Sequence, residues 1–183
     1  MRVIAGIARS LPLKTPAGLA TRPTTDRIKE TLFNMLQQQI GQAVFVDMFS
    51  GSGGIGIEAL SRGAAKAYFI ENDPKALSCI QENLQFTKLN KSSMIINMDA
   101  CASLSRIEEV VDILFMDPPY DSGLDVTVLQ LLSHASCIDE ETLIIVEAAL
   151  SKKSSDYEAC GFQVIREKKY KTNKHIFLKK RGA

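Results

Sequence analysis

The stretch AVFVDMFSGSGGIG, residues 43–56, decides the fold of this chain of 183 residues. Its first four residues, Ala43–Val46, are a continuous apolar run of the kind that forms a strand buried on both faces. Glycines follow at positions 51, 53 and 56 in the spacing G-x-G-x-x-G, and helix-forming residues continue to Arg62. A glycine-rich turn between a strand and a helix, with an acid about twenty residues further on, favours a nucleoside-bearing cofactor. The stretch therefore predicts an α/β fold with a cofactor site at this turn.

Short apolar runs and helical stretches alternate along the rest of the chain. Strands that are apolar on both faces and alternate with helices indicate a parallel sheet covered on both sides. The last two runs bracket the basic segment 166–174 and are typical of a closing hairpin. We expect a Rossmann-like α/β fold with a mostly parallel seven-stranded sheet and helices on both faces. The predicted strands are 43–46, 66–70, 94–96, 113–116, 143–146, 162–165 and 176–178, and the predicted helices lie within 24–40, 54–62, 73–84, 104–107 and 126–132 and near Tyr157.

The N-terminal segment is predicted to be a small appendage. Residues 2–22 combine a β-branched run with prolines and glycines that break it into short strands and turns. We divide the chain into a β-hairpin appendage at residues 1–22, which contacts RNA, and a main domain at residues 23–183. Either Thr24 or Thr25 is expected to cap the helix that follows, whose free N–H groups also suit an anion.

Composition and length are those of one globular domain. Hydrophobic residues make up 45% of the chain, and no apolar run approaches the ~18–20 residues that span a bilayer. The N-terminus lacks the unbroken apolar core of a signal peptide, so we expect a cytoplasmic protein with no membrane partner. The four cysteines and two histidines are scattered without metal-ligand or disulfide spacing, and no metal site is expected.

Charge is segregated along the chain, although the net charge is only +1. Residues 1–30 carry six basic and two acidic side chains, and residues 151–183 carry ten basic and three acidic ones. The middle of the chain is acidic, with sixteen acidic and six basic side chains. Basic ends predict contact with a polyanion, because Lys and Arg displace counterions from phosphates. The alternative for the C-terminal segment is a solvated basic tail.

Acidic residues follow the first four predicted strands. Ligands of doubly wound sheets bind outside the carboxyl ends of the strands, where Asp47, Glu71, Asp99 and Asp117 are expected. Glu71 is placed to accept hydrogen bonds from ribose hydroxyls, and Asp99 to accept one from an adenine amino group. Asp47 would repel a pyrophosphate but could accept from an ammonium, so S-adenosylmethionine fits better than NAD; turn formation by Asp47 and helix capping by Asp99 stay open. The expected cofactor-binding residues are Asp47, Phe49, Ser50, Gly51, Ser52, Gly53, Glu71, Asn72, Asp99 and Ala100.

The tetrapeptide Asp117-Pro118-Pro119-Tyr120 ends the fourth predicted strand and is the candidate active site. Proline has no N–H and a fixed φ near −65°, so sheet pairing stops at this point. The turn presents one carboxylate, carbonyls without a ladder partner and one flat ring in a fixed geometry. The alternative is an ordinary proline-rich turn with a helix-capping acid. The other acidic strand ends favour the active site, because they bring a cofactor beside it.

The tetrapeptide and the acidic strand ends resemble those of the Rossmann-like class I methyltransferases that modify exocyclic amino groups of bases. The segments Arg2–Gly6, Arg22–Arg27 and Glu30–Asn34 resemble the RsmD family of bacterial 16S ribosomal RNA guanine-N2 methyltransferases. The resemblance runs from residue 1 to about residue 150. It implies methylation, dependent on S-adenosylmethionine, of the N2 amine of one guanine in the small-subunit RNA. One departure is Lys171–His175, where a glycine-containing turn is expected, and it concerns only the geometry of the tail.

The chemistry that the resemblance implies agrees with the residues of the tetrapeptide. An aromatic amine is a poor nucleophile, because its lone pair is delocalised into the ring. Asp117 and the carbonyl of Pro118 can each accept one amino hydrogen and so localise that lone pair, while Tyr120 can stack on the flipped base. The expected catalytic residues are Asp117, Pro118, Pro119 and Tyr120, and the expected RNA-binding residues are Arg2, Arg9, Lys14, Arg22, Thr24 and Arg27.

The implied partner is 16S ribosomal RNA or the assembling 30S subunit, and we expect the protein to act as a monomer. Two other functions stay open. An adenine-N6 methyltransferase of DNA or RNA would use the same tetrapeptide. A non-catalytic RNA-binding assembly factor would keep the fold and lose the reaction.

Overall fold

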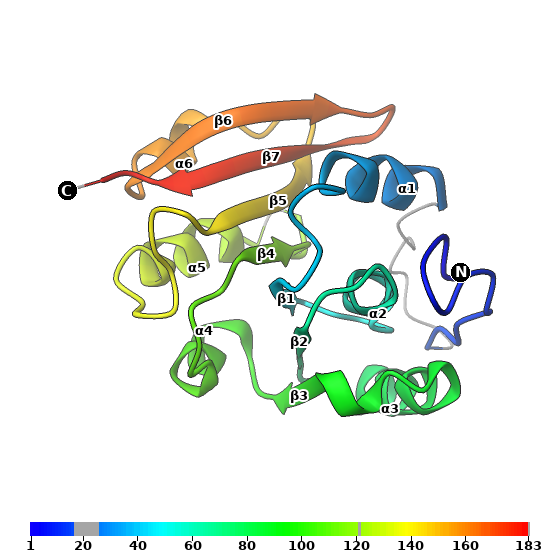
Figure 1. Ribbon diagram of the computed structural model, residues 1–183. Helices are drawn as coiled ribbons and strands as arrows, with labels where there is room; N and C mark the ends of the chain where they lie inside the picture. The colour runs from blue at the N-terminus through cyan, green and yellow to red at the C-terminus, as the bar shows by residue number, and fades with distance from the viewer. Residues whose placement is uncertain (17–25, 121, 183) are drawn as a thin grey trace.

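The computed structural model describes residues 1–16, 26–120 and 122–182, which form one seven-stranded sheet with helices packed around it (Figure 1). The strands are β1 (Val44–Met48), β2 (Lys66–Glu71), β3 (Ser93–Asn97), β4 (Ile113–Met116), β5 (Leu143–Ala149), β6 (Phe162–Lys169) and β7 (Asn173–Lys180). They lie in the order β3-β2-β1-β4-β5-β7-β6. Strands β1 to β5 run parallel, and β7 pairs antiparallel with β5 and β6. The mostly parallel sheet with a closing hairpin is therefore confirmed.

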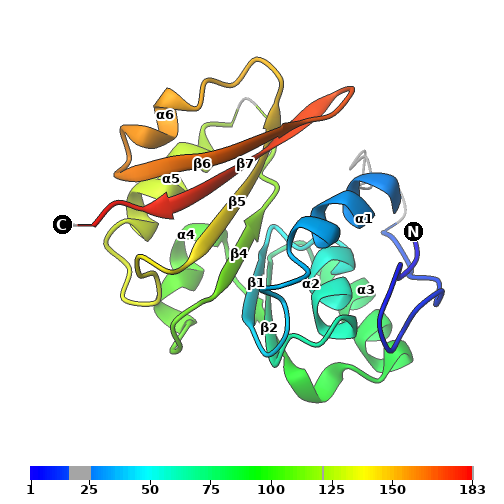
Figure 2. The same ribbon diagram turned by 45° about the horizontal axis from the view of Figure 1, so that its top comes forward.

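Helices cover both faces of this sheet, as the two views of the ribbon show (Figures 1 and 2). The helices are α1 (Asp26–Met35), α2 (Gly54–Ser61), α3 (Pro74–Thr87), α4 (Ala100–Ser103), α5 (Leu124–Leu132) and α6 (Ser155–Glu158), with 3-10 turns at Asn90–Ser92 and Leu104–Arg106. Helices α1, α2 and α3 pack on one face, and α4, α5 and α6 pack on the other. None of the helices in the described ranges is long and apolar enough to cross a membrane.

Side-chain caps decide where two of these helices begin. Asp73 caps α3, since its carboxylate accepts from the backbone N–H groups of Lys75 and Ala76 at 2.9 Å each. The helical stretch predicted at 104–107 starts earlier, at Ala100, because Asp99 accepts from the N–H of Ala102 and opens the turn there. The caps expected at Thr24 or Thr25 lie outside the described residues.

The alternation of side chains along each strand produces two hydrophobic cores. Phe45 and Phe115 face α1, α2 and α3, whereas Val46 and Leu114 face the other three helices, and all four are fully buried or nearly so. Each such burial stabilises the fold by roughly 1.5–3 kcal/mol. Burial on both faces is the reason that the predicted strands are continuous apolar runs.

The described part of the N-terminal segment, residues 1–16, is a turn-rich loop. Its hairpin pairing is reduced to one bridge between Arg2 and Pro12, and the N–H of Val3 donates to the carbonyl of Leu11 at 3.0 Å. Pro12 can donate no ladder bond, which keeps the pairing short. Val3 is fully buried in the same core as α1 and α2, so the segment is part of the packed domain.

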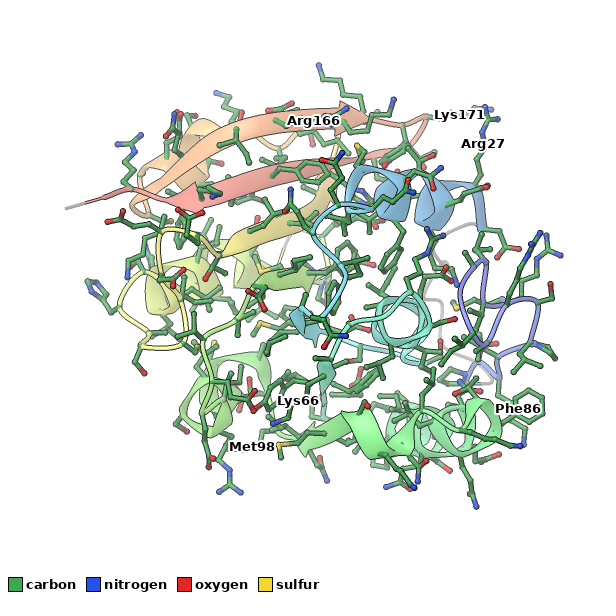
Figure 3. All side chains as sticks on the ribbon, in the orientation of Figure 1. Arg27, Lys66, Phe86, Met98, Arg166 and Lys171 are labelled. Atoms are coloured by element: carbon green, nitrogen blue, oxygen red, sulfur yellow. The ribbon has the colours of Figure 1, made fainter. Side chains whose placement is uncertain are left out.

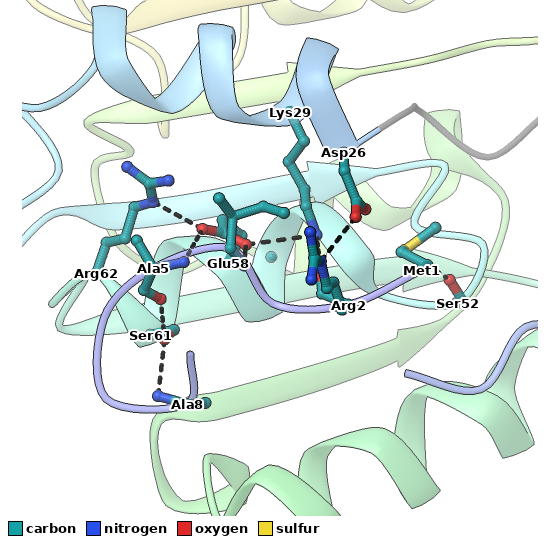
Figure 4. A network of polar contacts seen from close by, with 12 residues as sticks. Met1, Arg2, Ala5, Ala8, Asp26, Lys29, Ser52, Glu58, Ser61 and Arg62 are labelled. Atoms are coloured by element: carbon teal, nitrogen blue, oxygen red, sulfur yellow. Dashed lines mark hydrogen bonds and ion pairs between the residues drawn. The ribbon is translucent and has the colours of Figure 1, made fainter. Parts of the chain in front are cut away.

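A buried carboxylate fastens this loop to the helices beneath it (Figure 4). Glu58 on α2 has no exposed surface and accepts from the N–H groups of Ile4 at 2.8 Å and Ala5 at 3.0 Å. It also pairs with Lys29 on α1 at 3.4 Å and with Arg62 at 2.8 Å. Burial lowers the pKa of Lys29 against the opposing attraction of Glu58. One side chain thus ties α1, α2 and the N-terminal loop together.

Candidate active site

The glycine-rich loop after β1 is held in a tight left-handed conformation. Phe49, Gly51 and Gly53 have φ values of 66°, 56° and 78°. The buried side chain of Ser50 donates to the carbonyl of Asp47 at 2.5 Å and to that of Ile70 at 3.2 Å. The loop is therefore fixed to β1 and β2, and it ends where α2 begins, at Gly54.

The three motif glycines have different physical roles. A Cβ atom at Gly56 would lie 2.5 Å from the ring of Phe69, so this glycine allows α2 to pack on the sheet. Gly53 combines a positive φ with close contacts to Ile80 and Phe69. Gly51 also has a positive φ, but a Cβ atom there would meet nothing within 4 Å. The open side of the loop is thus at Gly51, where a ligand could approach the backbone.

Asp47 lies beneath the loop and is only 2% exposed. Its Oδ2 accepts from the N–H of Gly56 at 2.8 Å, which joins the end of β1 to the first turn of α2. Burial, followed by the charges of Asp117 and Glu71, raises the pKa of Asp47 well above its usual value, while the Gly56 N–H opposes this shift. A turn-forming role is therefore present, and a cation bound nearby would favour the ionised form.

Glu71 at the end of β2 connects this strand to the same loop. Its Oε2 accepts from the N–H of Gly51 at 2.8 Å, and its Oε1 accepts from the N–H groups of Asn72 and Asp73. Each carboxylate oxygen has two lone pairs, so Oε2 retains acceptor capacity for a hydroxyl group. Asn72 itself is exposed beside it.

The third group of expected cofactor residues follows β3. Asp99 is exposed and caps α4, and Ala100 is buried as the first residue of that helix. Ser52 is buried and contacts the sulfur of Met1 at 3.8 Å. The carboxylates in the last residues of β1 and β2 and the carboxylate after β3 lie at the carboxyl ends of neighbouring strands, as does the open backbone at Gly51. This chemistry fits a cationic nucleoside and disfavours a pyrophosphate.

The tetrapeptide leaves the sheet at the end of β4. Burial, followed by the charge of Glu147, raises the pKa of Asp117 to about 8. Pro118 is buried, whereas Pro119 and Tyr120 are exposed. Burial together with the charges of Glu147 and Asp117 also raises the pKa of Tyr120, so its hydroxyl stays protonated.

A second set of polar residues, which the sequence did not predict, lies next to the tetrapeptide. Met116 at the end of β4 pairs with Val146 in β5, so Asp117 and Glu147 occupy the next positions of these adjacent strands, and Glu147 pairs with His175 on β7. Glu147 Oε1 accepts from Asn173 Nδ2, and His175 Nε2 lies 3.1 Å from Oε2. The rule that predicted Asp47, Glu71, Asp99 and Asp117 from strand ends would also have found Glu147, had it been applied to the fifth strand.

A small cavity opens beside these residues. We call it the Tyr120 hollow; it has a volume of about 150 Å³. The Tyr120 hollow is lined by Pro118, Pro119, Tyr120, Gly123, Asp125, Glu147, Ala148, Ala149, Ser151 and Lys152. It therefore joins the tetrapeptide to the end of β5.

The expected RNA-binding residues do not share one environment. Arg2 pairs with Asp26 at 2.9 Å, and Lys14 pairs with Glu82. Arg9 and Arg27 are exposed, with no ion pair among the described residues. The remaining two, Arg22 and Thr24, lie outside the described residues.

Comparisons with known proteins point to one family. The family described as "Conserved hypothetical protein 95" matches residues 1–179. "Ribosomal RNA small subunit methyltransferase D" of Escherichia coli K12 is 38% identical over 148 residues, which cover 81% of this chain and 74% of that protein. The protein of the same name from Haemophilus influenzae is 38% identical over 157 residues, covering 83% and 80%.

A solved structure agrees over the whole chain. "Putative methyltransferase yhhF from Escherichia coli" superposes with a TM-score of 0.85 at 33% identity and covers 100% of this chain and 99% of that one. Together with the sheet order, this similarity gives the fold of the class I methyltransferases.

Proposed function

The chain belongs to the family described as conserved hypothetical protein 95, and from that premise we propose that it methylates ribosomal RNA. The reaction is transfer of a methyl group from S-adenosylmethionine to the exocyclic N2 amine of one guanine in 16S RNA of the small subunit. The observation that carries this proposal is the position of Asp117-Pro118-Pro119-Tyr120 at the end of β4, next to the glycine-rich loop after β1. The related proteins named for small-subunit RNA methylation support the choice of substrate.

Three strand ends supply the cofactor site. Glu71 would accept hydrogen bonds from the ribose hydroxyls. The ligand would approach the backbone of the loop at Gly51, and Asp99 would lie near the adenine base. Asp47 and Asp117 would face a positive charge, and that charge would lower the pKa values that burial has raised. When bound, S-adenosylmethionine supplies an electrophilic methyl group.

The tetrapeptide prepares the amine for attack. Asp117 and the Pro118 carbonyl accept one amino hydrogen each, so the nitrogen lone pair turns toward the methyl carbon. The N–C bond would form as the bond between the methyl carbon and sulfur breaks, with the neutral thioether S-adenosylhomocysteine as the leaving group. Positive charge then develops on the nitrogen, and the amine loses one proton to an oxygen of Asp117. Stacking on Tyr120 offsets part of the cost of taking the base out of its stack, at roughly 1–3 kcal/mol.

Exposed cations support binding of the RNA backbone. Figure 3 shows the labelled residues Arg27, Arg166 and Lys171 along one edge of the molecule. All three side chains are exposed. Because phosphate contacts depend on such charges, we assign this edge and Arg9 to the RNA backbone.

The test is methylation of ribosomal substrates with labelled S-adenosylmethionine, followed by digestion to nucleosides. We expect N2-methylguanosine from 16S RNA or 30S subunits, and loss of the label with Asp117→Ala. Labelled N6-methyladenosine would instead identify the adenine enzyme that uses the same tetrapeptide. Label in DNA alone, or none in any ribosomal substrate, would overturn the proposal.

A further inference from the structure

The buried polar cluster around Glu147 has no role in the steps described so far. Its members come from β5, from β7 and from the turn before β7. Glu147 is 6% exposed, Asn173 is 5% exposed and His175 is fully buried. Buried polar groups are costly unless they are paired, so a cluster of this kind at the edge of an active site calls for an explanation.

The cluster keeps Glu147 in place as a hydrogen-bond acceptor. Asn173 donates to Oε1, and the ring of His175 lies between Oε2 and the hydroxyl of Tyr170, at 3.1 Å from each. Both contacts of His175 are satisfied when Nε2 carries the proton and Nδ1 accepts from Tyr170. These donors surround a carboxylate that forms no ion pair with a Lys or Arg side chain in the described ranges.

Glu147 also lies close to the tetrapeptide. It follows Val146 within β5 as Asp117 follows Met116 at the end of β4, so the two carboxylates come from neighbouring positions of adjacent strands, and the charge of Glu147 contributes to the raised pKa of Asp117. It lines the Tyr120 hollow together with Pro118 and Tyr120. The Tyr120 hydroxyl donates to Oε1 of Glu147 at 3.4 Å, which is the longest of the three hydrogen bonds that Glu147 accepts. A long hydrogen bond is weak, so a donor of the substrate could replace the Tyr120 hydroxyl most easily.

We propose that Glu147 is the residue that selects guanine, by accepting a hydrogen bond from N1–H of the target base. This inference rests on the proposed function, because it needs a guanine whose amine is held by Asp117 and Pro118. In guanine, the N1–H donor lies next to the 2-amino group, so neighbouring acceptors match both. In adenine, N1 is an acceptor next to the 6-amino group, and its lone pair would face the carboxylate of Glu147.

The other wall of the Tyr120 hollow has a different role. Asp125 accepts from Lys152 at 2.8 Å and from the hydroxyl of Tyr157 at 2.7 Å. Asp125 is thus already paired with a cation, Lys152, and accepts a hydrogen bond from Tyr157. Glu147 is therefore the carboxylate that can distinguish the two purines by repulsion as well as attraction.

The experiment replaces the target guanine, once mapped, with 2-aminopurine in a ligated RNA. This base keeps the 2-amino group but has a lone pair at N1. The RNA is offered, free or assembled, in the form that the wild-type protein methylates. We expect the wild type to lose roughly 10- to 100-fold in kcat/KM on 2-aminopurine. Equal rates on the two bases would overturn the inference, and this comparison needs no variant.

The variant Glu147→Gln tests the residue itself. Its amide can donate to N1, so we expect slower methylation of guanine and a guanine-to-2-aminopurine ratio close to one. An unchanged ratio would contradict the assignment. Asp125→Asn is the matched control, since it removes a carboxylate from the same cavity and should leave the ratio as in the wild type.

Two further measurements separate the possible failures. Thermal unfolding and calorimetry with S-adenosylmethionine show whether Glu147→Gln is folded and binds the cofactor. Should the variant fail to fold, the comparison of the two bases with the wild type still decides the inference. Should the wild type fail to methylate guanine at all, it is the proposed function that is wrong.

Discussion

Asp117 is the residue on which the proposed chemistry depends, and its surroundings disfavour its ionised form. Burial and the neighbouring charge of Glu147 raise its pKa to about 8, yet the proposed step needs an ionised acceptor. A cofactor with positive charge resolves this conflict, because it stabilises the carboxylate when it is required. Burial raises the pKa of Asp47 as well, and the charge of Asp117 adds to this increase.

The rate should report this titration. We expect kcat/KM to rise with pH and to level off above about 8, because the free enzyme must lose the proton on Asp117. The pH midpoint of kcat should be lower, since the bound cation favours ionisation. Initial rates with limiting and with saturating S-adenosylmethionine, at a fixed RNA concentration across this range, measure both. A profile that is flat through this range would show that Asp117 is not titrating.

Stability should change with pH in the opposite sense. The carboxyl of Asp117 has a folded-state pKa above its unfolded value of ~3.9, so its contribution is full below that value and is lost as the pH rises through about 8. Asp117→Asn removes this loss, and we expect it to be more stable than the wild type at high pH although it is inactive. Urea unfolding of both proteins at low and high pH within the folded range measures the difference. A wild-type-like decrease in the variant would contradict the assignment.

At the scale of elements, Glu58 is the contact that holds α1, α2 and the N-terminal loop together. Lys29 is buried beneath it and also donates to the carbonyl of Arg2 at 2.6 Å. Removing one partner of a buried ion pair leaves an uncompensated charge. The N-terminal loop therefore depends on a pair that lies in two different helices.

We expect Glu58→Gln to lower the free energy of unfolding by about 3–5 kcal/mol, because it leaves Lys29 without its counter-charge. Urea unfolding measures this effect. The control is Glu82→Gln, which removes an exposed carboxylate from α3 and should leave stability unchanged within error. Equal changes in the free energy of unfolding for the two substitutions would mean that Glu58 does not hold α1, α2 and the N-terminal loop together.

The same elements show how far the sequence could predict the structure. Strands apolar on both faces and the glycine-rich turn between a strand and a helix are local patterns, and both are present as predicted. The pairing of Lys29 with Glu58 joins residues far apart in the chain, so no local pattern shows it. Glu147 and His175 meet only through the register of β5 and β7, which is also a property of the folded sheet.

At the scale of the whole molecule, basic residues of the two ends of the chain lie on one side of the structure. The start of α1 carries Arg27, and the hairpin of β6 and β7 carries Arg166 and Lys171, and the acidic strand ends lie between these segments in sequence (Figure 3). The fold thus brings basic residues from both ends of the chain to one side of the molecule, which we propose to be the side that binds RNA. The sequence predicted a polyanion partner but could not show that the two basic ends lie on the same side of the fold.

The salt dependence of RNA binding should reveal these contacts. We expect Arg27→Ala and Lys171→Ala each to weaken binding and to reduce the slope of log K against log[salt] by roughly 0.7–0.9 per lost phosphate contact. Filter binding of 16S RNA over a range of salt concentrations measures the slope. Arg106→Ala is the matched control, because Arg106 is exposed in the acidic middle of the sequence. A slope unchanged in all three variants would remove this edge from the interface.

The most direct measurement of the proposed activity is a mass-spectrometric methylation map of 16S RNA from cells with and without this protein. We expect one N2-methylguanosine to be missing from cells that lack the protein, restored by the wild-type chain and not by Asp117→Ala. Identical maps in the presence and absence of the protein would contradict the proposed function.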